Sequence, residues 1–145
     1  MLDRDFLDSL DLSDIKNKFV YKYKWTKVEA QECEKLYKNY LYLSYKYFKK
    51  NKLVPTNEVD LFWHEHILDT NKYINDCNSL FGEYLHHYPS YSFGKKNKNN
   101  PNHQSLFNNT QELHKKNFGY YMYDIKTSWT RLIWTLVKKV FKRSS

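Results

Sequence analysis

The stretch TKVEAQECEKLYKNYLYLSYKYFKK, residues 26–50, predicts one long helix. Thr26 and Glu29 have the spacing of a capping box, in which each side chain accepts from a backbone N–H of the first helical turn. The apolar and tyrosine positions that follow recur at helical intervals to about residue 49: Val28, Cys33, Leu36, Tyr40, Leu43 and Tyr47. This spacing gives the helix one face that can pack on a core.

The composition of the whole chain agrees with a helical protein. A length of 145 residues suits one domain that buries about two-thirds of the surface its unfolded form exposes. Three glycines and three prolines leave little turn chemistry for a protein of many strands. Aromatic residues make up 19% of the chain, which excludes a disordered protein. We therefore expect an all-α, single-domain bundle of four to five helices.

Four further segments complete the predicted bundle. A short helix begins near Ser13, and a third helix covers about residues 58–81 and carries the motif WHEH. A fourth helix covers about residues 104–118, and residues 120–145 form a basic amphipathic helix. The predicted division is thus a helical domain of residues 1–119 followed by this C-terminal helix or tail.

The net charge of +8 is concentrated at the end of the chain. Residues 120–145 carry six cations and one acid, which gives +5, and the loop GKKNKNN at residues 94–100 adds +3. The rest of the chain is therefore balanced, which disfavours a nucleic-acid-binding face on the domain. The cations within residues 126–143 suggest docking on a protein partner or on an anionic membrane surface. No apolar run is long enough for a transmembrane helix.

Two observations predict a cytoplasmic protein. The chain begins with the acidic stretch MLDRDFLDSLDLSD, which has no apolar region of a secretory leader. Its two cysteines, Cys33 and Cys77, form no CxxC pair and are expected to be buried thiols in a reducing setting.

Four of the six histidines lie between positions 64 and 87. A helix turns about 100° per residue, so His64 and His66 should lie on nearly opposite faces and cannot bind one ion together. Asp60 and His64 are four residues apart and should share a face. Each face therefore has to be interpreted separately.

Two interpretations of these histidines stay open. In the first, Asp60 and His64 supply one edge of a divalent metal site, and His86 or His87 returns from beyond Gly82 to complete it. Such nitrogen and oxygen ligands suit zinc or iron, and three of them with an open position would be a catalytic arrangement. The pocket around this site would include Trp63, His66, Asp69, Tyr73 and Asp76. In the second, the histidines are packing residues, with His66 hydrogen-bonded to Asp69 or to a tyrosine hydroxyl.

The stretch VPTNEVDLFWHEHILDTNKYINDCNSLFGEYLHHYP, residues 54–89, resembles the glycine-rich domain-containing protein-like family. Bacterial-type members of that family share the pattern WHxHILDT…LHHxP, and the likeness extends over about residues 11–119. The resemblance favours a shared polar or metal site made by the acidic and histidine positions of this pattern: Asp60, His64, His66, Asp69, Asp76, His86 and His87. In plants a related domain stands beside glycine-rich and RNA-binding regions, but this chain has no glycine-rich segment to which an RNA role could be transferred.

The predicted function is therefore that of a small helical protein whose His/Asp pocket binds zinc or iron. The sequence identifies no catalytic residue, and an enzymatic reaction is left open. The alternative is a non-catalytic protein-interaction module whose C-terminal helix docks on a partner or an anionic membrane.

Overall fold

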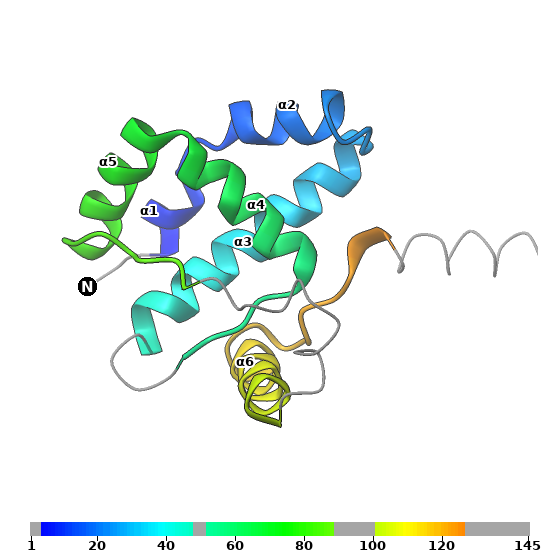
Figure 1. The fold of residues 1–145 in the computed structure, drawn as a ribbon, viewed down its shortest axis with the longest axis vertical. Coiled ribbons are helices and arrows are strands. Elements are labelled where there is room, and N and C mark those ends of the chain that lie inside the picture. The colour runs from blue at the N-terminus through cyan, green and yellow to red at the C-terminus, as the bar shows by residue number, and fades with distance from the viewer. Residues whose placement is uncertain (1–3, 48–51, 89–100, 127–145) are drawn as a thin grey trace, which may run out of the picture.

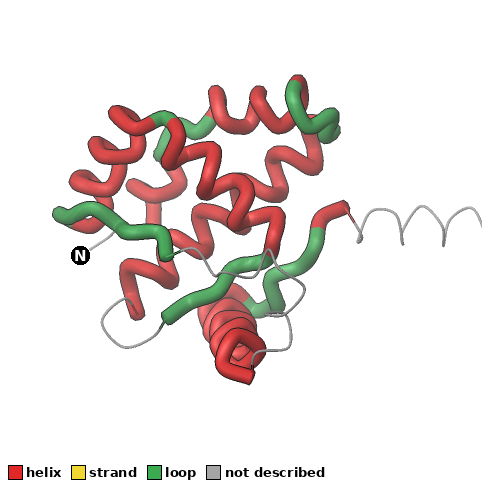
Figure 2. The backbone as a smooth tube through the Cα atoms, in the orientation of Figure 1, coloured by secondary structure: helices red, strands yellow, loops and turns green. Residues whose placement is uncertain are grey.

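The computed structural model describes residues 4–47, 52–88 and 101–126. These residues form six α-helices and no strand, which confirms the all-α prediction (Figure 2). The helices are α1 (Arg4–Asp8), α2 (Ser13–Tyr21), α3 (Lys27–Tyr47), α4 (Asn57–Leu68), α5 (Thr70–Phe81) and α6 (Pro101–Phe118). The predicted number of four to five helices is too low, because one predicted helix is broken and α1 was not expected.

The single helix predicted for residues 58–81 is wrong, because the chain bends at Asp69. The backbone of Asp69 leaves the helical region, with φ −83° and ψ 75°, and separates α4 from α5. Its N–H donates to the carbonyl of His66, and its own carbonyl accepts from the N–H of Tyr73 in the first turn of α5. Figure 1 shows α5 leaving α4 in a new direction. The WHEH motif therefore lies on α4, the fourth helix of the described residues.

Two further differences from the prediction are the presence of α1 and the start of α6. Helix α1 has five residues and one buried side chain, Leu7, so it is too short to show a periodic pattern. Helix α6 begins at Pro101 rather than near Gln104. Proline suits this first position because its fixed φ is helical and the N–H that it lacks would have no partner within the helix.

Helix α3 is the centre of the bundle and packs against α1, α2, α4 and α6 (Figure 1). Its predicted capping box is present: the Thr26 N–H donates to Glu29 Oε2 at 2.8 Å, and the Glu29 N–H donates to Thr26 Oγ1 at 3.1 Å. The buried face of α3 includes Cys33, Leu36 and Tyr37. A capped start and a buried stripe together fix where this helix begins and which side meets the other helices.

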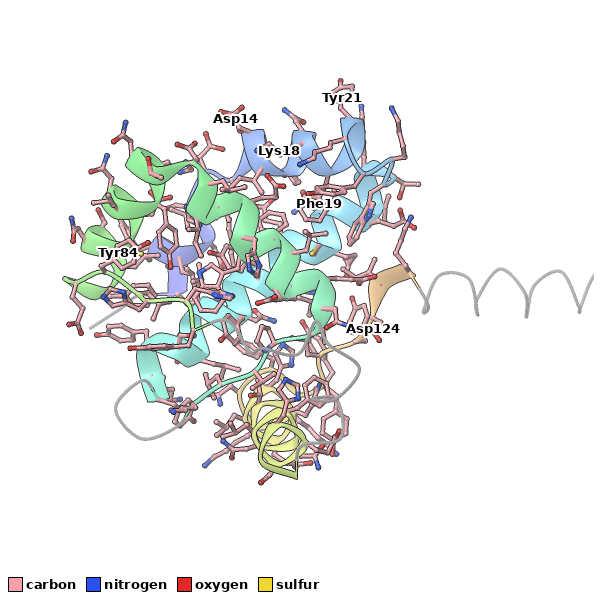
Figure 3. The ribbon with its side chains drawn as sticks, in the orientation of Figure 1. Asp14, Lys18, Phe19, Tyr21, Tyr84 and Asp124 are labelled. Carbon is pink, nitrogen blue, oxygen red and sulfur yellow. The ribbon has the colours of Figure 1, made fainter. Side chains whose placement is uncertain are left out.

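Aromatic side chains join α2 to α4 and to Trp25, which precedes α3, in the core. Phe19 points from α2 into the bundle, whereas Asp14 and Tyr21 of the same helix project outward (Figure 3). The ring of Phe19 lies 5.0 Å from Phe62 of α4 and 4.9 Å from Trp25, between centroids. Rings at these distances add roughly 0.5–1.5 kcal/mol per pair to the gain from burial. The contact of Phe19 with Phe62 thus packs α4 against α2.

Residues 120–126 pack on the bundle beside the start of α4 (Figure 1). Met122 and Ile125 are buried in the core, and Glu58 accepts hydrogen bonds from the N–H groups of Ile125 at 2.5 Å and Lys126 at 3.0 Å. The first part of the predicted tail thus contributes to the core. The remainder of that tail, residues 127–145, lies outside the described residues. None of the helices in the described part of the chain is long and apolar enough to cross a membrane.

Candidate metal centre

Asp60 and His64 lie one turn apart on a partly exposed face of α4. The Nδ1 atom of His64 is 2.6 Å from the backbone oxygen of Asp60 and 3.4 Å from its Oδ2. A carbonyl oxygen only accepts, so Nδ1 carries the proton of this hydrogen bond. The Nε2 atom of a neutral His64 ring then keeps its lone pair, and the side chain is 40% exposed. This imidazole is accessible to an ion from solvent.

His87 reaches the same carboxylate from the segment that follows α5. Its Nε2 lies 2.8 Å from Asp60 Oδ1 and donates to it. The rings of His87 and His64 are 4.4 Å apart between centroids, and the Trp63 ring lies 4.3 Å from His87 on another side. Two imidazoles from separate segments thus meet at Asp60.

Asp60, His64 and His87 each offer one ligand atom, and these atoms lie within 4.8 Å of one another. In a tetrahedral zinc site with bonds of about 2.0–2.1 Å, ligand atoms are roughly 3.3 Å apart, so small side-chain rotations would suffice to close this group around an ion. Two imidazoles and a carboxylate are a ligand set of zinc and of ferrous iron. The three residues can therefore hold a divalent metal ion.

His86 lies outside this group although it is adjacent to His87. Gly82 ends α5 in the left-handed region, with φ 71°, and the chain after it is not helical. Along this segment buried and exposed side chains alternate, as they do in an extended chain. Leu85 is buried and His87 partly buried, whereas His86 is exposed and its ring contacts that of Tyr84, 4.8 Å away between centroids. Alternation thus separates the two neighbouring histidines.

His66 belongs to a second polar cluster on the opposite face of α4. Its side chain is 1% exposed, and its Nε2 donates to Asp76 Oδ2 at 2.9 Å, because a carboxylate can only accept. Its Nδ1 then accepts from the Tyr37 hydroxyl, also at 2.9 Å. Burial lowers the pKa of His66, and the Asp76 carboxylate opposes part of that shift. The buried ring is neutral and fully hydrogen-bonded, which fits the packing interpretation for this histidine.

The other residues of the expected pocket have distinct places. Trp63 Nε1 donates to the Tyr73 hydroxyl at 2.8 Å, and that hydroxyl donates to the carbonyl of Leu85 at 2.7 Å. Trp63 thus contacts the ring of His87, and its bond to Tyr73 connects α4 to the segment that carries His87. Asp69 is exposed at the junction of α4 and α5 and belongs to neither polar cluster.

Sequence reasoning missed one member of the His66 cluster, Tyr37, and a separate buried polar cluster around Glu65. Tyr37 follows the helical stripe of α3, and that stripe predicts burial without showing that its hydroxyl meets His66. Glu65 stands between the two histidines of the WHEH motif, yet it is buried and bonded to Lys18, Lys22 and Tyr23. Burial alone would raise the pKa of Glu65, but these hydrogen bonds outweigh it and lower the pKa to about 2. The resulting carboxylate joins α2 to α4.

The fold and the site define the protein as a small all-α domain with a candidate metal centre of two histidines and one aspartate on α4. The model of the UCP032817-like family matches residues 4–120, and the chain belongs to this family. The match includes all six helices and the three candidate ligands. No curated protein and no solved structure matches the chain.

Proposed function

We propose that this protein binds a divalent metal ion, zinc or ferrous iron, through Asp60, His64 and His87. The proposal depends on one observation: two imidazoles from different segments contact the same carboxylate, with Asp60 oxygens 2.8 Å from His87 and 3.4 Å from His64. The Asp60 carboxylate supplies negative charge, and each imidazole would supply one lone pair, that of His87 Nε2 once the ion displaces the proton donated to Asp60 in the metal-free protein. The relation of this site to the glycine-rich domain-containing family stays a prediction.

The number of protein ligands favours a reactive site over a structural one. Structural zinc sites are closed by four protein ligands, whereas a site with three leaves a position for water or substrate. His64 lies on the exposed side of the group and His87 on the buried side, so the open position would face solvent. A metal held in this way lowers the pKa of its bound water and can polarise a substrate oxygen. We therefore propose a hydrolytic or oxidative use of the metal.

Metal analysis of protein purified without a histidine tag tests the proposal. We expect stoichiometric zinc or iron in the wild-type protein and its loss in His64→Ala and His87→Ala. His86→Ala is the matched control, because His86 is the adjacent histidine and lies outside the group. Loss of metal from His86→Ala to the same extent would show that bulk histidine content, and not this site, binds the ion.

A second candidate function is a non-catalytic interaction module, favoured by the direct hydrogen bond between Asp60 and His87. On this account the bond only fastens the segment after α5 to α4, and residues 126–143 dock on a protein or an anionic membrane. His87→Ala would then lower the melting temperature by the same amount with and without chelator. A chelator effect that is present in the wild type and absent in His87→Ala would rule this account out.

A further inference from the structure

We propose that Tyr73 is a positioning residue, whose hydroxyl holds His87 where it can bind the metal. This inference rests on the proposed function and names a residue that touches neither the ion nor the ligand atoms. Tyr73 lies on α5, and its hydroxyl contacts both sides of the candidate site, Trp63 on α4 and Leu85 in the segment that carries His87.

The two hydrogen bonds of this hydroxyl have a fixed direction. The indole of Trp63 can only donate, so the hydroxyl accepts from it at 2.8 Å. Its own proton is then given to the carbonyl of Leu85 at 2.7 Å. All three residues are buried, so no water replaces a lost partner and each bond is costly to break.

Holding Leu85 also holds His87. The two residues are two positions apart in a segment of alternating side chains, so both face the bundle. The hydrogen bond from the Tyr73 hydroxyl thus fixes the backbone two residues before the ligand.

The other bond of the hydroxyl acts on the ring of His87. Trp63 precedes the ligand His64, and its ring meets the His87 ring edge-on at 4.3 Å between centroids. The bond to Tyr73 fixes the indole in this orientation. One hydroxyl therefore positions both the backbone before His87 and the Trp63 ring that packs against the His87 ring. The His87 side chain is thus ordered before the ion binds. Partners of this kind, one step removed from the metal, typically change affinity by about 10–100-fold.

Tyr73→Phe tests this role, and Tyr40→Phe is its matched control. Tyr40 is also buried, its ring lies 5.3 Å from Trp63, and its hydroxyl donates to a backbone carbonyl, that of Leu53, at 3.2 Å. Both variants lose one buried hydroxyl beside the same indole, but only Tyr73→Phe releases the segment of His87. The readouts on the full chain are the dissociation constants of Zn²⁺ and Co²⁺ and the ligand-field spectrum of bound Co²⁺.

We expect Tyr73→Phe to bind both ions at least about tenfold more weakly and to alter the Co²⁺ spectrum, while Tyr40→Phe keeps wild-type affinity and spectrum. In the metal-free protein, amides of residues 84–88 should exchange faster in Tyr73→Phe than in Tyr40→Phe. Equal metal affinity in the two variants would overturn the positioning role and leave the metal site standing. A wild-type protein that binds neither ion would instead remove the proposed function, and this inference with it.

Discussion

His64 and His66 lie two residues apart on α4 and have different chemical surroundings. His66 is buried with both ring nitrogens hydrogen-bonded, whereas His64 is 40% exposed beside Asp60. The helical turn of about 100° per residue accounts for this separation. A histidine with a free lone pair near solvent can bind an ion, and one with two satisfied nitrogens in the core cannot do so without losing its partners.

A third histidine, His114 on α6, is also buried and held in one neutral form. Its Nδ1 donates to the carbonyl of Tyr120 at 2.7 Å, and its Nε2 accepts from Asn39 Nδ2 at 3.2 Å. The assignment follows because Asn39 Oδ1 is occupied by the Arg4 guanidinium at 2.8 Å, which directs the amide N–H₂ toward the ring. A proton on Nε2 would face this donor.

The surroundings of His114 predict a loss of stability in mild acid. Burial lowers the pKa of His114 below its ordinary 6.5, although the hydrogen bond to Tyr120 opposes this. As the pH falls, His114 therefore takes up a proton in the unfolded chain before it does so in the folded protein. The contribution of neutral His114 to stability is complete above about pH 6.5 and is lost as the pH falls toward the folded pKa. Denaturant unfolding of the wild-type protein should give a smaller free energy of unfolding at about pH 5.5 than at about pH 7.5.

His114→Gln is the variant that tests this assignment. It removes the titrating ring, and we expect it to be less stable than the wild type at neutral pH and less sensitive to acid. Part of the pH dependence should remain, because burial also lowers the pKa of His66. An unchanged pH dependence in His114→Gln would contradict the account.

Single residues of the candidate site could be predicted only in part. The spacing of Asp60 and His64 was sufficient to place them on one face of a helix. The choice between His86 and His87 depends on the alternation of buried and exposed side chains after α5. The sequence has no apolar pattern that predicts this alternation. The partners of His66, Tyr37 and Asp76, come from two other helices, and contacts of this kind leave no local signal.

At the scale of the elements, the break between α4 and α5 shows how periodicity can mislead. The bend occupies one residue, Asp69, so the apolar positions before and after it stay in step with one helix. Helix starts and ends marked by side chains or glycine were predicted more reliably. The capped start of α3 and the helix ends predicted near residues 81 and 118 agree with the structure.

Gly82 determines both where α5 ends and where the His87 segment begins. Its φ of 71° is unfavourable for a residue with a side chain, and a Cβ there would touch nothing within 4 Å. Gly82→Ala should therefore cost about 1 kcal/mol of unfolding free energy through the backbone alone. Metal affinity should fall as well, because the turn directs the chain toward Asp60.

Gly119→Ala provides the matched control for this substitution. Gly119 also has a positive φ, 87°, and a Cβ there would touch nothing within 4 Å, but it follows α6 and precedes the segment that packs on Glu58, not the one that carries His87. Urea unfolding should show a similar loss in both variants, and zinc titration a loss in Gly82→Ala alone. Equal metal affinity in the two variants would mean that the turn at Gly82 does not direct His87.

At the scale of the whole molecule, α3 unites the fold because four other helices pack on it. The long α3, its cap and the all-α class could be predicted, since each depends on local spacing. The helices that pack on α3 could not be predicted, because contacts such as that of Asn39 with Tyr120 join residues far apart in the chain. The same limit applies to residues 120–126, whose part in the core depends on α4.

Two truncations test the role of residues 120–126 in the fold. Deleting residues 120–145 removes the buried Met122 and Ile125 and leaves Glu58 without the two N–H groups that it accepts from. Burial of each apolar side chain contributes roughly 1.5–3 kcal/mol, so this deletion should cost several kcal/mol. Deleting residues 127–145 keeps all of these contacts and should lower the melting temperature less. Equal melting temperatures for the two truncated proteins would contradict the packing described for this segment.

The measurement that most directly tests the metal site is elemental analysis of untagged wild-type protein beside His87→Ala and His86→Ala. One zinc or iron ion per chain is expected in the wild type and in His86→Ala, and none in His87→Ala. Chelator should lower the melting temperature of the first two proteins only. A wild-type protein that carries no stoichiometric zinc or iron and melts identically with and without chelator would contradict the central claim.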